Sequence, residues 1–134
     1  MDYKHSYKGL FVFLAIHFSA LIGVGIISVW KDFIPLLFIA NVITIGMTIL
    51  MYIIYKTEYI YWMNGVEYEK ALIVGSRRRK EFARKHLERM GKAAIFGLII
   101  TFISIIFGLS QFIAFPIIFI NFIVICISTV NIEL

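Results

Sequence analysis

Five of the polar side chains that lie within long apolar stretches of the sequence are the first candidates for chemistry. They are His17, Asn41, Thr44, Thr101 and Asn121. A polar or ionisable group is costly to place in an apolar segment, so it marks either a contact between helices or a path for a solute. The amides and hydroxyls could line such a polar track, and His17 could carry a proton. The sequence leaves both interpretations open.

A second group of candidates is basic and belongs to the one long polar stretch, residues 56–92. Residues 67–74 and 76–90 have helical periodicity, with Gly75 dividing them. The second segment has an apolar side, and most of its other residues are basic. A basic amphipathic helix of this kind is expected to lie on an anionic membrane surface. The predicted contact residues are Arg77, Arg78, Arg79, Lys80, Phe82, Arg84, Lys85, Leu87, Arg89 and Met90.

Three roles are open for this basic stretch. It could rest on lipid headgroups and fix the topology, dock a protein partner, or bind nucleic acid through the basic residues 77–80. A basic run beside an apolar segment is ordinarily a topology signal. We therefore expect the anionic lipids of the cytoplasmic leaflet as a partner, and a membrane protein or a second copy of the chain as another. Nucleic acid is the least favoured.

Motifs typical of enzymes and cofactor-binding proteins are missing from the sequence. The three histidines are scattered, Cys126 is the single cysteine, and no P-loop, dinucleotide fingerprint or HExxH motif occurs. The apolar stretches contain no Asp or Glu, which argues against exchange driven by a membrane-embedded carboxylate. We expect a protein that is not an enzyme and has no metal and no cofactor.

The composition indicates which solvent surrounds the apolar stretches. Of the 134 residues, 61% are hydrophobic and 16% are charged, against roughly 45–50% apolar and about 25% charged residues in ordinary soluble domains. A water-soluble fold of this length needs more polar surface than this chain can supply. The sequence therefore predicts an integral membrane protein of the all-α class.

Four apolar runs are predicted to be transmembrane helices, at about residues 9–30, 33–55, 93–109 and 112–130. About 20 residues cross the hydrocarbon core, so the two shorter runs need a small extension or local thinning of the bilayer. A signal peptide is the rival interpretation of the first run, but no small-x-small cleavage site follows it. We expect one domain, residues 1–134, folded as a four-helix transmembrane bundle of two tandem hairpins.

Local signals predict how these helices begin and end. Lys31 and Asp32 separate the first two runs, and Asp32 could cap the second helix. Asn64-Gly65 predicts a turn, and residues 108–111 predict a tight hairpin. Pro116 is expected to kink the last helix. Both hairpins have a proline followed by an asparagine early in their second run, which fits either a duplication or chance.

The basic residues are distributed very unevenly about the four predicted crossings. Both termini and residues 56–92 share one side, which holds twelve of the 13 Lys and Arg residues, and Lys31 alone lies on the other. Basic residues favour the cytoplasmic side of a membrane. All seven tyrosines and Trp62 fall on this same side, as aromatic residues at a membrane interface do. We expect a multi-pass protein of the plasma membrane with both termini in the cytoplasm.

Together these features predict a non-enzymatic membrane protein. The favoured role is an accessory, regulatory or immunity-type partner of another membrane component, contacted through the helices or the basic stretch. The alternative is a small transporter or channel subunit that uses the polar track. The sequence identifies neither a partner nor a solute.

Overall fold

The computed structural model describes residues 3, 5–30, 35–63 and 65–134. These residues form helices and no strand, as the predicted all-α class requires. The elements in chain order are α1 (Lys8–Trp30), α2 (Pro35–Thr57), the short 3-10 helix η1 (Ile60–Trp62), α3 (Tyr68–Ile73), α4 (Gly75–Phe107) and α5 (Gln111–Val130).

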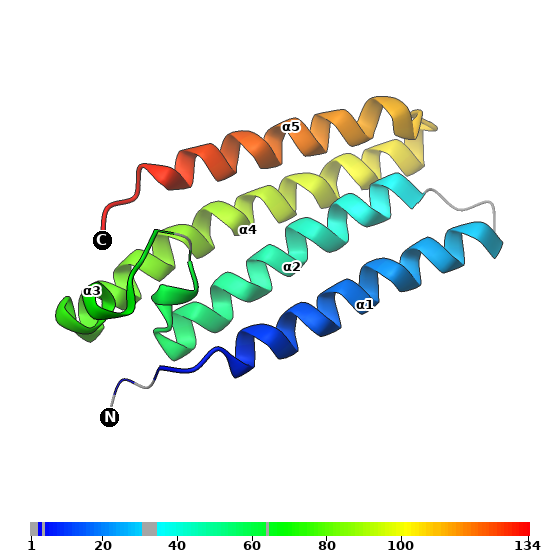
Figure 1. The fold of residues 1–134 in the computed structure, drawn as a ribbon. Helices are drawn as coiled ribbons and strands as arrows, with labels where there is room; N and C mark the ends of the chain where they lie inside the picture. Colours follow the sequence, from blue (N-terminus) through cyan, green and yellow to red (C-terminus); the bar gives the residue numbers. More distant parts are fainter. Residues whose placement is uncertain (1–2, 4, 31–34, 64) are drawn as a thin grey trace.

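Four of these helices are long and apolar enough to cross a membrane: α1, α2, α4 and α5. They lie side by side, and the two chain termini and α3 lie at the same end of the assembly (Figure 1). We call this end, made of residues 3, 5–7, 57–63, 65–92 and 131–134, the basic end. The prediction of four helices able to span a membrane is confirmed.

Helix α4 differs from the prediction. The basic helix and the third apolar run were expected to be separate elements, with the basic helix flat on the membrane surface. Instead α4 runs without a break from Gly75 to Phe107 over 33 residues, a length of about 50 Å. One glycine at position 91 costs a helix only about 1 kcal/mol, too little to interrupt it. The basic half of α4 therefore continues along the axis of its apolar half (Figure 1).

The helix ends are set by glycine and by a serine cap. Gly75, with a φ of 76°, separates α3 from α4, a conformation that costs glycine little. Gly108 ends α4 with a φ of 64°, and Ser110 then caps α5 by accepting a hydrogen bond from the N–H of Phe112. Pro116 lies inside α5, so it does not mark the start of that helix.

Some of the predicted turn signals lie outside the described residues. These are the turn at Lys31 and Asp32, the capping role of Asp32, and Asn64 of the Asn64-Gly65 pair. Gly65 itself has a φ of 83°, which is a turn conformation that favours glycine.

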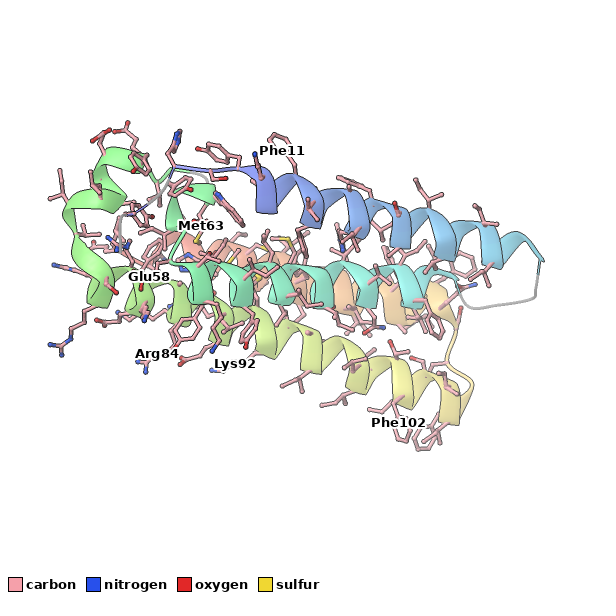
Figure 2. The ribbon with its side chains drawn as sticks, turned by 90° about the horizontal axis from the view of Figure 1, so that it is seen from below. Phe11, Glu58, Met63, Arg84, Lys92 and Phe102 are labelled. Atoms are coloured by element: carbon pink, nitrogen blue, oxygen red, sulfur yellow. The ribbon has the colours of Figure 1, made fainter. Side chains whose placement is uncertain are left out.

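Helix α2 is the centre of the assembly and packs against α1, α4 and α5. Helix α1 packs mainly on α2, and none of its described side chains is buried. Phe11 of α1 and Phe102 of α4 are 68% and 65% exposed and point away from the helices on opposite sides (Figure 2). Such outward apolar side chains are expected where the surrounding solvent is lipid.

Candidate functional site

The predicted polar residues of α2 and α4 meet at the contact between these helices. The amide Nδ2 of Asn41 donates to Thr101 Oγ1 at 2.6 Å and to the carbonyl oxygen of Leu37 at 2.7 Å. Thr44 lies one turn further along α2 and donates its hydroxyl to the carbonyl of Asn41 at 3.2 Å. All three polar side chains are buried. We call Asn41, Thr44 and Thr101 the buried polar cluster.

Gly97 lets a third helix approach this cluster. A Cβ at position 97 would lie 3.1 Å from Asn41 Oδ1, 3.6 Å from Thr44 Oγ1 and 3.4 Å from Ile118 Cγ2 of α5. The absence of a side chain therefore allows α2, α4 and α5 to meet at one point. This close approach through a small residue is the usual way in which helices pack in a membrane.

Two amide oxygens in this region lack a hydrogen-bond donor. Asn41 Oδ1 and Asn121 Oδ1 are both buried without a partner among the described residues. Asn121 lies three residues after Ile118 on α5, which places both on one face of that helix. A buried acceptor without a donor is costly, roughly 1–3 kcal/mol. Each oxygen is therefore able to accept from a water molecule, a solute or another chain.

His17 lies apart from the buried polar cluster. Its ring packs directly on Gly46 of α2, where it occupies the space a Cβ would need, and it stacks on Phe13 at a centroid distance of 5.6 Å. His17 therefore belongs to the contact between α1 and α2, whereas the cluster lies between α2 and α4. The structure does not place all five predicted residues along one track.

The basic end contains an ion pair that the sequence did not predict. Arg79 is only 8% exposed, and its Nε and Nη2 lie 3.1 and 2.9 Å from Glu58 Oε2. Its Nη1 donates to the carbonyl of Ala71 at 3.0 Å. The other carboxylate oxygen of Glu58 accepts from the Ser76 hydroxyl at 2.7 Å and lies 3.4 Å from Lys80 Nζ. Glu58 thus holds the start of α4 against the end of α2 (Figure 2).

The titration of Glu58 reflects these contacts. Burial alone would raise the pKa of its carboxyl, but hydrogen bonds from Ser76, Arg79 and Lys80 outweigh burial and hold the pKa below its usual value. Glu58 also has a φ of 62°, a left-handed backbone conformation that is unfavourable for a residue with a side chain. The carboxylate is therefore charged at neutral pH and fixed in place.

The segment before α1 packs against the Glu58–Arg79 ion pair. The Tyr3 ring stacks over the Arg79 guanidinium at 4.1 Å, and its hydroxyl donates to the carbonyl of Glu58 at 2.9 Å. Tyr68 donates to the carbonyl of Tyr3 at 2.6 Å. The carbonyl of Ser6 accepts from the Tyr61 hydroxyl and from the indole N–H of Trp62, each at 2.9 Å. These aromatic contacts join the first residues of the chain to the segment after α2.

The ten predicted contact residues of the basic stretch fall into two groups. Phe82 and Met90 are buried in the protein's own core together with Arg79, while Leu87 and Arg89 are partly buried. Arg89 Nη1 donates to the carbonyl of Ser128 on α5. The remaining five are exposed and form what we call the basic face, consisting of Arg77, Arg78, Lys80, Arg84 and Lys85.

Sequence reasoning missed several residues that organise these sites. Glu58 belongs to no recognisable sequence motif. Its partner Arg79 is 21 positions away, so the sequence does not indicate that the two residues meet. Gly97 is a small residue, and a small residue alone does not show which neighbouring helices it allows to approach. Ser104, like Gly97 and Thr101, lies in the interior of the bundle; it is buried and donates to the carbonyl of Ile100.

Comparison of the chain with protein-family models, curated proteins and solved structures finds no match. Within the described residues, no group of three or more His, Cys, Asp and Glu side chains is arranged to hold a metal ion.

Proposed function

We propose that this protein is a non-enzymatic accessory, regulatory or immunity-type partner of another membrane component. It would reside in the plasma membrane as a four-helix bundle with both termini and the basic end in the cytoplasm. The uneven distribution of Lys and Arg supports this orientation, because twelve of the 13 belong to that side.

The basic face of α4 is the observation that carries the proposal. Its five Lys and Arg side chains project from the surface, while the opposite side of the same helix is used for internal packing. Glu81 and Glu88 pair with Lys85 at 3.1 Å and Arg84 at 3.5 Å. These exposed pairs are weak and leave an excess of positive charge. An acidic segment of a partner is the complementary surface.

The continuity of α4 favours a protein partner over lipid headgroups for most of this face. Residues 75–92 precede the apolar half of α4 and extend about 25 Å along the helix axis. The headgroup layer is only about 5–8 Å deep on each side of the hydrocarbon core. In this orientation Arg89 and Lys92 meet the headgroups, whereas Arg77 and Arg78 stand beyond them.

Purification from the native host in a gentle detergent tests this role. Wild-type protein is expected to recover one stoichiometric membrane partner, and the triple variant R77E/R78E/R84E is expected to lose it. The matched control K8E/K56E/K70E makes the same change in net charge at exposed positions outside the basic face. Recovery of the partner with both triple variants would rule out docking through this face.

A small transporter or channel subunit is the second candidate, supported by the unpartnered amide oxygens of Asn41 and Asn121. Protein in liposomes would then move an ion or small solute, and Asn41→Leu or Asn121→Leu would abolish that flux. Thr48→Val is a suitable control, because the Thr48 hydroxyl already donates to the carbonyl of Thr44 in its own helix. Lack of flux across a broad panel of ions and solutes would reject this candidate.

A further inference from the structure

An open cleft of about 830 Å³ lies between α2, the first half of α4, the end of α5 and the segment that follows η1. Its lining is mostly apolar, and the charged residues that line it are Lys70 and Glu133. Neither the buried polar cluster, nor the Glu58–Arg79 ion pair, nor the basic face contributes to this cleft.

The sulfur atoms of the chain are concentrated here. The sequence has five methionines and one cysteine. Every sulfur-containing residue that the structure describes lines the cleft, namely Met47, Met51, Met63, Met90 and Cys126. Figure 2 shows sulfur atoms gathered near Met63. The sulfurs come from α2, α4, α5 and the segment after η1, so the fold and not the sequence order brings them together.

Four of the potential metal ligands that line the cleft lie in pairs on two neighbouring helices. Met47 and Met51 are four residues apart on α2, and His86 and Met90 are four residues apart on α4. Residues at this spacing share one side of a helix. Helices α2 and α4 thus each present a pair of potential metal ligands, and Cys126 of α5 and Met63 after η1 add two more.

His86 is held in the orientation that metal-binding histidines commonly have. Its Nδ1 lies 3.0 Å from the carbonyl oxygen of Phe82. A carbonyl oxygen can only accept, so Nδ1 carries the hydrogen and Nε2 keeps its lone pair. A backbone carbonyl on the other ring nitrogen is a usual partner for a histidine that ligates a metal. His86 also lines the cleft, which makes Nε2 the nitrogen available to a ligand.

We propose that this cleft binds a soft monovalent metal ion, Cu(I), through methionine sulfurs, His86 Nε2 and Cys126 Sγ. Thioether and thiolate sulfurs favour Cu(I), and imidazole also binds copper, whereas Mg²⁺ and Ca²⁺ require oxygen ligands. Cys126 would lose its thiol proton on binding the ion. The cleft is wider than one ion, and binding draws the methionines together, because their unbranched side chains have three rotatable bonds. This site departs from the expectation of no metal and does not depend on the proposed docking role.

Replacement of methionine by leucine tests the proposal with little change in volume. The purified full chain in detergent is titrated with Cu(I) under reducing conditions, in competition with bicinchoninate, and separately with Ag(I). Wild type should bind one ion, and M47L/M51L/M63L/M90L in a Cys126→Ser background should lose at least about tenfold in affinity. His5→Gln, which alters a histidine outside the cleft, should bind like wild type.

X-ray absorption at the copper edge of the loaded wild-type protein keeps the test decisive if the quadruple variant misfolds. Sulfur scatterers in the first coordination shell are expected. Coordination by nitrogen and oxygen alone would overturn the proposal, and so would unchanged Cu(I) and Ag(I) binding by a folded quadruple variant. Single variants Met47→Leu and Met90→Leu should each weaken binding, and wild-type affinity in both would reject the pairs on α2 and α4 as ligands.

Discussion

Arg79 and Glu58 form an ion pair that joins the start of α4 to the residue just beyond α2. Their side chains are 10% and 18% exposed, and Arg79 Nη2 lies 2.9 Å from Glu58 Oε2. Tyr3 covers the guanidinium at 4.1 Å. The Glu58 carboxylate and the Arg79 guanidinium therefore each need the other, because a buried charge left unpaired strongly destabilises the folded state.

Arg79→Met should therefore destabilise the protein far more than Lys80→Met. Loss of Arg79 leaves the Glu58 carboxylate without its main partner and is expected to cost about 3 kcal/mol. Lys80 is 53% exposed and lies 3.4 Å from the same carboxylate, so its loss should cost no more than about 0.5 kcal/mol. Denaturant titration in mild detergent measures both. Equal costs would show that the buried pair does not hold the two helices together.

Stability should fall at acidic pH because of Glu58. Hydrogen bonds keep the pKa of its carboxyl below the ordinary value of 4.5 in the folded protein. The folded state therefore binds this proton less readily than the unfolded state. The resulting stabilisation is fully present above about pH 4.5 and is lost as the pH falls through the folded pKa. Thermal unfolding between pH 3 and 7 should show this fall, and Glu58→Gln should flatten it.

Gly97 and Gly91 should respond in opposite directions to alanine. A Cβ at position 97 would crowd Asn41 Oδ1 at 3.1 Å, whereas a Cβ at position 91 meets nothing within 4 Å. Gly91→Ala should stabilise α4 by up to about 1 kcal/mol through helix propensity. Gly97→Ala should lose that gain and cost about 1 kcal/mol by separating the helices. Unfolding in detergent measures both, and equal stabilisation would contradict the close approach at Gly97.

The contact between α1 and α2 should depend on His17 and Gly46. A Cβ at position 46 would overlap the His17 ring, so Gly46→Ala is expected to cost about 1–3 kcal/mol. In a His17→Ala background the same change should cost almost nothing, and the double-mutant cycle gives the coupling. Gly23→Ala on α1, where a Cβ meets nothing within 4 Å, is the control. An identical cost in both backgrounds would place His17 elsewhere.

The membrane helices were predictable because hydropathy averages over about 20 residues and tolerates local errors. The polar residues Asn41 and Thr101 were singled out because amides and hydroxyls join helices in lipid, and they are hydrogen-bonded. The hydrogen bond between them could not be predicted, because it depends on how α2 and α4 are rotated about their own axes. His17 was equally conspicuous, yet it faces Gly46 and not these residues.

Neither the continuity of α4 nor the role of Glu58 could be predicted from the sequence, because both depend on tertiary packing. Gly91 is compatible with a helix end or a helix interior, because its cost is only about 1 kcal/mol and packing decides. In the sequence Glu58 follows Lys56 and Thr57, and nothing in these neighbours distinguishes it from any other surface glutamate. Its significance comes from Arg79, which only the turn through α3 brings back to it.

The orientation in the membrane underlies the proposed function, and cysteine labelling of intact cells tests it most directly. Single cysteines are introduced at Arg78 and Leu109 in a Cys126→Ser background. Both positions are exposed, and Arg78 lies in the first turn of α4 whereas Leu109 lies just beyond its last residue. An impermeant maleimide should label Leu109→Cys in intact cells and Arg78→Cys only after the membrane is permeabilised. Labelling of Arg78→Cys from outside intact cells would contradict the cytoplasmic placement of the basic face.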